Sequence, residues 1–200
     1  SFIEMMNATA TKLGMTRTHF ANTNGLPDPN QYTTARDLAR LSRAVVAEYP
    51  EYAHYWSAPA LRIGNRRLGS HNALLKTFPG ADGLKTGFTC DSGYNVVASA
   101  TREGRKLMAV VLGESSGDER AVRAASLLEH GFQTYGWKEL FNTNDLDTLP
   151  ADPAAKPLMS VRTTVLAWSC GNRPVHAKPA KGKKSPKTAK AKKTGDDAVQ

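Results

Sequence analysis

The sequence predicts a mixed fold of the α/β (α+β) class, with a central antiparallel sheet flanked by helices. Three strand-like segments with short connections lie between residues 83 and 112, and amphipathic helical patterns lie on either side of them. The chain has 200 residues, of which 40% are hydrophobic. A chain of that size can bury one sizeable core, so we expect one domain followed by a tail.

Residues 2–13 are predicted to form an amphipathic helix that ends at Gly14. Their apolar side chains recur at steps of three and four residues: Phe2, Ile3, Met6, Ala10 and Leu13. Residues 18–30 are rich in Asn, Gly, Pro and Asp, which set turn dihedrals or bond their own backbone. We therefore expect an ordered loop after the first helix.

A second helix is predicted before Pro50, with Thr33 or Thr34 as its cap. Asp37 falls in its first turn, where the helix dipole favours an anion. The side chains expected to form its buried stripe are Leu38, Leu41, Val45 and Val46.

The predicted sheet has three strands, over residues 83–89, 94–101 and 106–112. A tight Glu-Gly turn at 103–104 joins the last two strands, and a short hairpin over residues 61–68 precedes the sheet. The last two strands are nearly continuous apolar runs, as expected for strands that are covered on both faces.

A third helix is predicted from Glu119 to about His130, capped by Ser115-Ser116-Gly117-Asp118 and ending at Gly131. This helix can cover one face of the sheet. The residues that it is expected to bury are Ala121, Ala124, Leu127 or Leu128, and Phe132.

The predicted domain covers residues 1–135. Residues 136–173 form a poorly defined extension broken by prolines, with at most one more strand over residues 160–168. Residues 174–200 repeat Lys, Ala, Pro and Gly without apolar positions, so nothing offsets the entropy of ordering them and we expect disorder. This tail holds eight lysines and two aspartates of a chain with net charge +9, so the remainder is close to neutral.

Cys90 and Cys170 are the two cysteines, and their spacing indicates neither a disulfide scaffold nor a metal site. They permit one disulfide, but free thiols are the favoured interpretation. The five histidines share no metal-ligand spacing, so we interpret them as surface or loop residues and predict no metal and no cofactor. No run of about eighteen apolar residues occurs, so no membrane span is predicted.

The tripeptide Lys85-Thr86-Gly87 in the first predicted strand is the main candidate for a functional site. Gly83 and Gly87 bracket the lysine and threonine, and glycine within a strand often marks the close approach of a ligand or another backbone. An ammonium and a hydroxyl beside a residue without a side chain can hold a carboxylate. Lys-Thr-Gly is also the third element of β-lactamase and penicillin-binding sites. The alternative is a lysine on a solvated strand face.

A wider pattern resembles the low-molecular-weight penicillin-binding D-alanyl-D-alanine carboxypeptidases. It runs over residues 2–132 in the order and spacing of that family, and Arg120 falls where the family places an arginine. The resemblance implies a β-lactamase-like or transpeptidase-like fold. The matching segments are Met6-Asn7-Ala8, Leu13-Gly14-Met15-Thr16, Thr18-His19-Phe20-Ala21-Asn22, Gly25-Leu26, Tyr32-Thr33-Thr34-Ala35-Arg36-Asp37-Leu38-Ala39, Gly83-Leu84-Lys85-Thr86-Gly87, Ser92-Gly93-Tyr94 and Val97-Ala98-Ser99-Ala100.

This resemblance implies a serine enzyme on the periplasmic side of a bacterial inner membrane. It would remove the terminal D-alanine from peptidoglycan stem peptides and would bind β-lactam antibiotics. Lys85 and Thr86 would hold the substrate carboxylate beside Gly87, and Arg120 would add positive potential. The N–H of Phe88, which replaces the histidine that the family often has here, would donate to the oxyanion of the tetrahedral intermediate.

The nucleophile is the main departure from the family pattern. No serine in the sequence is followed three residues later by a lysine, and no S-x-N occurs where the family has one. The family places both elements before the point at which this chain begins. The resemblance therefore implies that the nucleophilic serine and the basic lysine lie upstream, and that this chain is the C-terminal part of a catalytic domain.

Two other functions stay open: a β-lactamase, which shares the Lys-Thr-Gly element, and a non-catalytic module that binds peptidoglycan or penicillin. The stretch over residues 32–39 favours the carboxypeptidase. We interpret the lysine-rich tail as a solvated linker, with a weak contact to the anionic cell envelope as the alternative. Nucleic-acid binding is not expected, because no aromatic residues interleave the lysines.

Overall fold

The computed structural model describes residues 1–141, 145–150, 160–167 and 170. The predicted tail over 174–200 and most of the extension before it lie outside these residues. Among the helices of the described part, none is both long and apolar enough to cross a bilayer.

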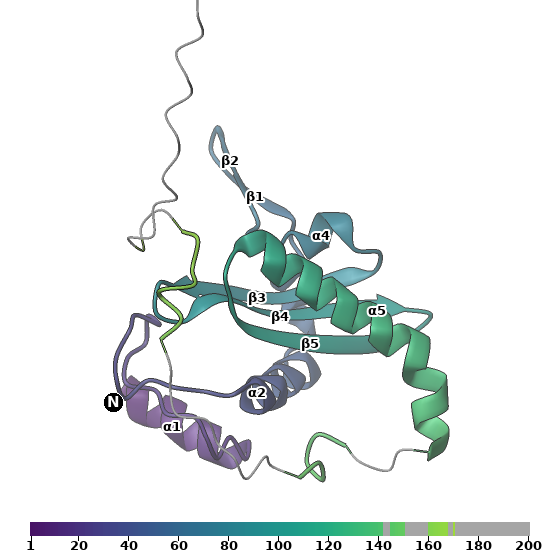
Figure 1. The fold of residues 1–200 in the computed structure, drawn as a ribbon, viewed down its shortest axis with the longest axis horizontal. Helices are drawn as coiled ribbons and strands as arrows, with labels where there is room; N and C mark the ends of the chain where they lie inside the picture. Colours follow the sequence, from purple (N-terminus) through teal and green to yellow (C-terminus); the bar gives the residue numbers. More distant parts are fainter. Residues whose placement is uncertain (142–144, 151–159, 168–169, 171–200) are drawn as a thin grey trace, which may run out of the picture.

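The body of the molecule has three layers (Figure 1). Helix α5 (Gly117–Phe141) covers one face of a three-stranded sheet, and helix α2 (Ala35–Glu48) lies against the other face. Helix α1 (Phe2–Lys12) lies beyond α2, on the side away from the sheet. The predicted antiparallel sheet with flanking helices is thus confirmed.

The sheet has the strand order β3-β4-β5, and both pairs are antiparallel. Its strands are β3 (Ala81–Thr89), β4 (Gly93–Arg102) and β5 (Arg105–Glu114), which confirms the three predicted strands. The central strand β4 carries five consecutive buried residues, 96–100. Strand β3 forms one edge, so every second N–H and C=O along it points away from its partner strand.

The core lies between the sheet and α5. Ala124 and Leu128 of α5 are buried there, with exposed fractions of 0% and 1%. Small and branched side chains suit this interface, because they let a helix approach a sheet closely. The strand residues in the same cluster are Val96, Ala98, Ala100, Ala109 and Val111.

The C-terminal end of α5 differs from the prediction. Ser116 Oγ accepts the Glu119 N–H at 3.1 Å, which confirms the predicted cap, but the helix continues beyond Gly131 to Phe141. A Cβ atom on residue 131 would lie 2.9 Å from Leu107 Cδ1. This glycine therefore permits close packing of the helix on the sheet, and its interpretation as a helix stop was wrong.

Helix α2 begins where the sequence predicts. Thr34 Oγ1 accepts the Asp37 N–H at 3.2 Å and caps the helix. The predicted apolar stripe is only half-buried, and the fully enclosed residues of α2 are polar: Asp37 and Ser42. The stripe prediction was wrong in this respect, because the helix end binds a polar loop and not only an apolar sheet face.

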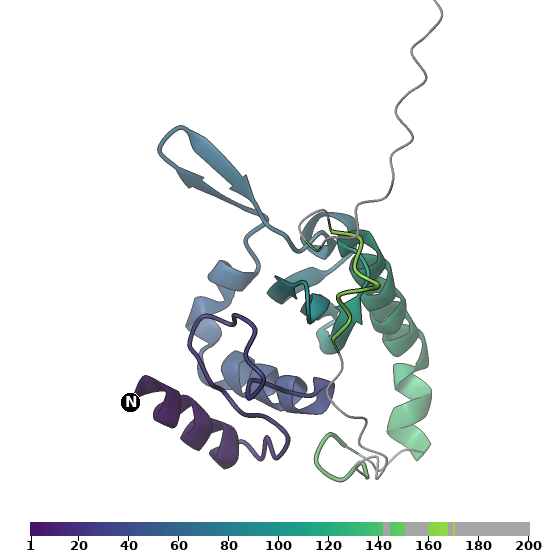
Figure 2. The same cartoon turned by 60° about the vertical axis from the view of Figure 1, so that its left-hand side comes forward.

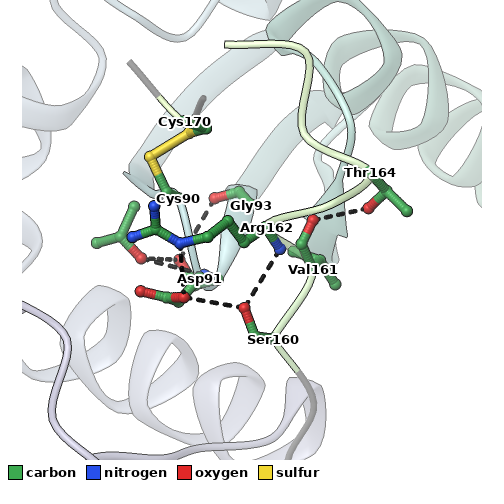
Figure 3. Close-up of a disulfide and its surroundings, with 10 residues drawn as sticks. Cys90, Asp91, Gly93, Ser160, Val161, Arg162, Thr164 and Cys170 are labelled. Carbon is green, nitrogen blue, oxygen red and sulfur yellow. Dashed lines mark hydrogen bonds and ion pairs between the residues drawn. A yellow bond between two sulfur atoms is a disulfide. The ribbon is translucent and has the colours of Figure 1, made fainter. Parts of the chain in front are cut away.

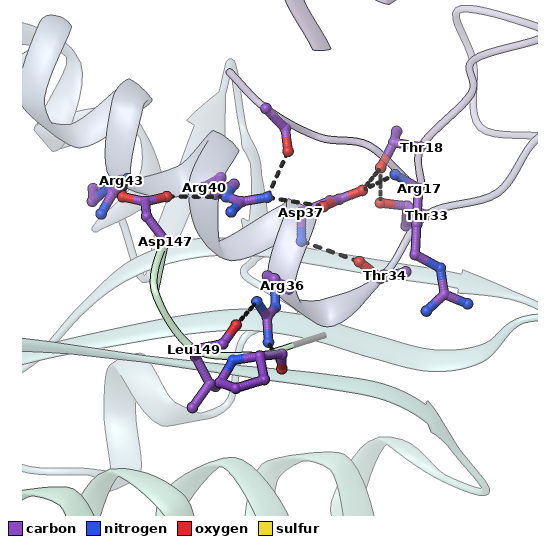
Figure 4. A network of polar contacts seen from close by, with 12 residues as sticks. Arg17, Thr18, Thr33, Thr34, Arg36, Asp37, Arg40, Arg43, Asp147 and Leu149 are labelled. Atoms are coloured by element: carbon purple, nitrogen blue, oxygen red, sulfur yellow. Dashed lines mark hydrogen bonds and ion pairs between the residues drawn. The ribbon is translucent and has the colours of Figure 1, made fainter. Parts of the chain in front are cut away.

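Asp37 is the centre of a polar network that ties this loop to α2 (Figure 4). Its Oδ2 accepts the Arg17 N–H at 2.9 Å and the Thr18 hydroxyl at 2.8 Å. Only 2% of Asp37 is exposed, so these charge-assisted bonds lie out of solvent. Farther along α2, Arg40 and Arg43 both bind Asp147.

A hairpin, β1 (Ala60–Ile63) and β2 (Arg66–Gly69), projects from the body and confirms the one predicted over 61–68 (Figure 2). Three short helices flank it in the chain. They are η1 (Pro50–Tyr52), α3 (Ala53–Trp56) and α4 (Leu74–Thr77).

Cys90 and Cys170 form a disulfide, with their Cα atoms 5.3 Å apart (Figure 3). The prediction of free thiols was therefore wrong. The two residues are 80 positions apart, so only the fold brings them together. Residues 160–167 contain a turn at 162–164 and no strand, where the sequence allowed at most one.

Candidate active site

The tripeptide Lys85-Thr86-Gly87 lies in β3, the first strand of the sheet, as predicted, and the strand order makes β3 an edge. The pairing register places Thr86 opposite Val96 and Lys85 opposite Val97. Paired residues direct their side chains to the same face of a sheet. Because Val96 belongs to the core under α5, Thr86 points to the α5 face and Lys85 to the α2 face.

Lys85 is exposed, and its Nζ donates a hydrogen bond to the main-chain oxygen of the next residue, Thr86. This bond folds the ammonium back along the strand edge. The side chains of Lys85 and Thr86 thus leave the strand on opposite faces, and the structure does not bring them together on one side. A ligand that contacts both has to lie along the edge of β3.

The two glycines that bracket the tripeptide have different roles. A Cβ on residue 83 would lie 2.9 Å from Trp56 Cδ1 and 3.1 Å from Ser99 Oγ, so Gly83 makes room for side chains of the protein itself. Gly87 is exposed, and the nearest atom to its Cβ position is Asn95 Cβ at 4.0 Å. Space for an incoming molecule is therefore found at Gly87.

Phe88 is 39% exposed, and its ring packs against Tyr94 with a centroid distance of 4.2 Å. This contact fixes the backbone at the end of β3. Thr89, the next residue, holds the turn after β3: its Oγ1 lies 2.8 Å from Ser92 Oγ and accepts the Ser92 N–H at 3.1 Å. These contacts of Phe88 and Thr89 fix the backbone where β3 ends and the turn to β4 begins.

Arg120 of α5 lies behind the tripeptide and is only 7% exposed. Its guanidinium donates to the main-chain oxygens of Asn95 at 3.3 Å and His71 at 2.7 Å, and it lies 5.6 Å from the centre of the Tyr94 ring. Asn95 pairs with Gly87 in the sheet, so the guanidinium is one strand away from the open position.

No ion pair to a carboxylate holds the Arg120 cation within the described part of the chain. Burial lowers the pKa of its guanidinium, an effect that Tyr94 opposes, yet arginine stays protonated in proteins. A buried cation bound only to carbonyl dipoles leaves positive potential in its surroundings. The positive potential of Arg120 favours binding of an anion on the face of β3 that carries Thr86.

Asn72 is a positioning residue that the sequence did not reveal. Its buried Nδ2 donates to the oxygen of Gly83 at 3.1 Å and so holds the start of β3. Ser70-His71-Asn72 has the letters S-x-N, but this amide is engaged by the strand backbone. The signal that could have found it is a polar residue between a hairpin and a strand, which commonly bonds main-chain groups.

The described residues contain no cluster of three or more His, Cys, Asp or Glu arranged for a metal ion. What the residues on β3 and α5 provide is a hydroxyl, two cations and free strand edge around an open glycine. Such an arrangement can bind a carboxylate and a peptide backbone.

Comparison with known proteins decides the family. A sequence model described as D-alanyl-D-alanine carboxypeptidase matches residues 1–116, more than half of the 200-residue chain. The chain belongs to the D-alanyl-D-alanine carboxypeptidase family. This membership confirms the resemblance inferred from the sequence.

Two similar proteins described as D-alanyl-D-alanine carboxypeptidases come from Escherichia coli and Haemophilus influenzae. DacD of Escherichia coli (strain K12) is 43% identical over 136 residues, which cover 67% of this chain and 35% of that protein. DacA of Haemophilus influenzae is 36% identical over 146 residues, which cover 72% of this chain and 36% of that protein. The chain thus spans about a third of the length of these curated relatives.

Solved structures confirm the transpeptidase-like fold. Penicillin-binding protein D2 of Listeria monocytogenes, in its cefotaxime-bound form, is 35% identical with a TM-score of 0.61. The similarity covers 66% of this chain and 55% of that one. Penicillin-binding protein 5 of Haemophilus influenzae is 36% identical with a TM-score of 0.63, over 66% of this chain and 39% of that one.

Proposed function

We propose that the protein containing this chain is a serine-type D-Ala-D-Ala carboxypeptidase that trims peptidoglycan stem peptides outside the cytoplasmic membrane. Family membership and the edge strand with its open Gly87 support this proposal. The single observation that carries it furthest is Arg120, a buried cation without a carboxylate partner among the described residues, beside the Lys-Thr-Gly strand.

In this proposal, the substrate lies along the edge of β3 with its terminal carboxylate near Gly87. Lys85 approaches the carboxylate from the α2 face, while Thr86 donates its hydroxyl from the α5 face, where Arg120 adds positive potential. The Phe88 N–H donates to the developing oxyanion.

The nucleophilic serine and its basic lysine come from residues upstream of this chain in the proposed enzyme. The serine oxygen attacks the carbonyl of the penultimate D-alanine, and the lysine accepts its proton. The peptide bond then breaks, and the terminal D-alanine leaves with a proton on its nitrogen. Water hydrolyses the acyl-serine ester to regenerate the enzyme. A β-lactam forms the same kind of ester by opening its ring.

Intact-mass spectrometry after incubation with benzylpenicillin tests the proposal. The chain as given and a form extended upstream to its natural start are compared. We expect a covalent adduct on the extended form alone, because the chain itself lacks the S-x-x-K serine. Adduct on neither form would favour a binding module without a nucleophile. Rapid loss of the adduct with release of opened penicillin would favour a β-lactamase.

A further inference from the structure

The turn that follows the Lys-Thr-Gly strand is held by a distant part of the chain. Cys90 is bonded covalently to Cys170, and Asp91 next to it receives contacts from residues 160–162 (Figure 3). The Asp91 oxygen accepts the Val161 N–H at 2.9 Å. Its carboxylate accepts the Ser160 hydroxyl at 2.9 Å and the Arg162 Nε–H at 3.2 Å. We call residues 160–167 with Cys170 the brace.

The brace is also attached to the start of α5. The Leu166 N–H donates to the oxygen of Ser115 at 2.9 Å, and Val165 next to it is fully buried. Val161 packs close to Gly93 at the beginning of β4, where a Cβ would lie 2.8 Å from its Cγ2. The brace therefore contacts the turn between β3 and β4 on one side and the segment before α5 on the other.

These two attachment points flank the residues proposed to bind substrate. Cys90 follows Phe88 by two positions at the end of β3, and Ser115 precedes Arg120 by five positions at the start of α5. The distance between Phe88 and Arg120 is thus set partly by the brace. A carboxylate held between β3 and α5 depends on that spacing, because site geometry must be kept within about half an ångström for full effect.

We propose that the brace positions β3 and α5 for recognition of the substrate carboxylate, and that the Cys90–Cys170 disulfide locks it in place. This inference rests on the proposed function. The ionic contacts of Asp91 with Arg162 are exposed to solvent, where such pairs contribute little. The covalent bond is therefore the attachment that sets the brace, and Cys90, Asp91 and Cys170 are positioning residues.

The covalent attachment of the brace can be removed by reduction of the Cys90–Cys170 disulfide. A dithiol reductant such as dithiothreitol transfers two electrons and two protons to the Cys90–Cys170 bond. Two thiols form in the protein, and the reductant becomes a cyclic disulfide. After reduction, the brace loses its covalent attachment and keeps non-covalent ones, among them its hydrogen bonds, the Arg162–Asp91 ion pair and the buried Val165.

The test uses the upstream-extended protein in its oxidised form and after reduction with dithiothreitol and capping with iodoacetamide. Two peptides that end in D-Ala-D-Ala are compared, one with a free terminal carboxylate and one with a terminal amide. We expect reduction to lower the ratio of their kcat/KM values about fivefold, since carboxylate recognition is lost selectively. Partial unfolding lowers both values together and leaves the ratio unchanged.

Asp91→Asn keeps the disulfide and weakens the hydrogen bonds of the brace, so we expect a smaller fall of the same ratio. Asp147→Asn is the matched control, because it removes a carboxylate that is paired with Arg40 and Arg43 of α2 and not with the brace. The ratio should not change in this control. An unchanged ratio after reduction would overturn the proposed role of the brace.

Hydrogen exchange on the chain as given provides a readout that does not depend on activity. We expect reduction to accelerate amide exchange at residues 86–92 and 115–120, with little change in the hairpin over 60–69. Equal exchange before and after reduction would overturn the inference even if the enzyme is active. Absence of turnover and of a penicillin adduct in the oxidised extended protein would instead refute the proposed function.

Discussion

Lys85 and Arg120, the two cations assigned to the candidate site, differ in how firmly the fold holds them. The exposed Lys85 bonds a neighbouring main-chain oxygen, whereas the guanidinium of Arg120 is fixed by two carbonyls from separate segments. Lys85 was identifiable from its tripeptide. The partners of Arg120 were not, since backbone oxygens leave no mark in a sequence.

Replacing Lys85 by Ala in the upstream-extended protein should slow acylation by benzylpenicillin about a hundredfold, as expected when one stabilising charge is removed from such a site. Stopped-flow or mass-spectrometric measurement of the acylation rate checks this. Lys12→Ala, which removes an exposed lysine from α1, is the control and should leave the rate unchanged. A normal rate in Lys85→Ala would remove this residue from the site.

Replacing Asp37 by Asn should destabilise the fold by about 2–3 kcal/mol, because a buried carboxylate that accepts two hydrogen bonds is lost. Urea denaturation monitored by circular dichroism measures the change. Asp118→Asn offers a matched control, since it also removes an acid from the first turn of a helix but at an exposed position. Equal stability losses in the two variants would contradict the structural role of Asp37.

At the scale of elements, periodicity and turn residues predicted where most helices and strands lie. Glu103-Gly104 joins β4 and β5 as expected, with positive φ angles of 51° and 75°. The errors came from residues whose role is tertiary. A glycine such as Gly131 often ends a helix, but here it lets α5 pack close to Leu107. No local sequence pattern reveals this tertiary contact.

Glycines with similar backbone angles should respond differently to substitution. Gly25 (φ +73°) has no atom within 4 Å of its Cβ position, so Gly25→Ala should cost only the backbone strain of about 1–2 kcal/mol. At Gly93 (φ +70°), the Cβ would lie 2.8 Å from Val161 Cγ2 and 2.9 Å from the Glu114 oxygen. Gly93→Ala should lose a further ~1–3 kcal/mol through overpacking.

Urea denaturation of both glycine variants against the parent gives the two free energies of unfolding. The difference between them measures the close packing around Gly93, to which Val161 and the main chain of Gly113 and Glu114 contribute. Similar losses in both variants would contradict this close packing around Gly93, and would weaken the case for the brace.

At the scale of the whole molecule, the sequence predicted an antiparallel sheet flanked by helices but not the disulfide that joins distant parts of the chain. The disulfide joins residues 80 positions apart, and nothing in the spacing of two cysteines indicates proximity. The same limit applies to the site. The Lys-Thr-Gly strand was identified from its letters, whereas the separation of Lys85 and Thr86 onto opposite faces follows from the register with β4.

The stability of the fold in acid should depend in part on Asp82. Burial alone would raise the pKa of its carboxyl, but hydrogen bonds from Lys106, Ser99 and Thr101 outweigh burial and lower the pKa below its usual 3.8. These bonds measure 2.6, 2.5 and 2.6 Å. Because the folded pKa lies below the unfolded one, the carboxylate stabilises the fold fully above the unfolded pKa, and this contribution is lost as the pH falls from there through the folded pKa.

The parent protein should therefore hold a constant urea midpoint near neutral pH and lose stability from about pH 5 downward. Asp82→Asn should be less stable at neutral pH and should lose less on acidification, because it no longer takes up that proton on unfolding. Urea titrations of the parent and of Asp82→Asn at neutral and acidic pH measure the two slopes. A parental slope in Asp82→Asn would mean that other carboxylates account for the acid transition, and that the Lys106 pair between β3 and β5 contributes nothing to it.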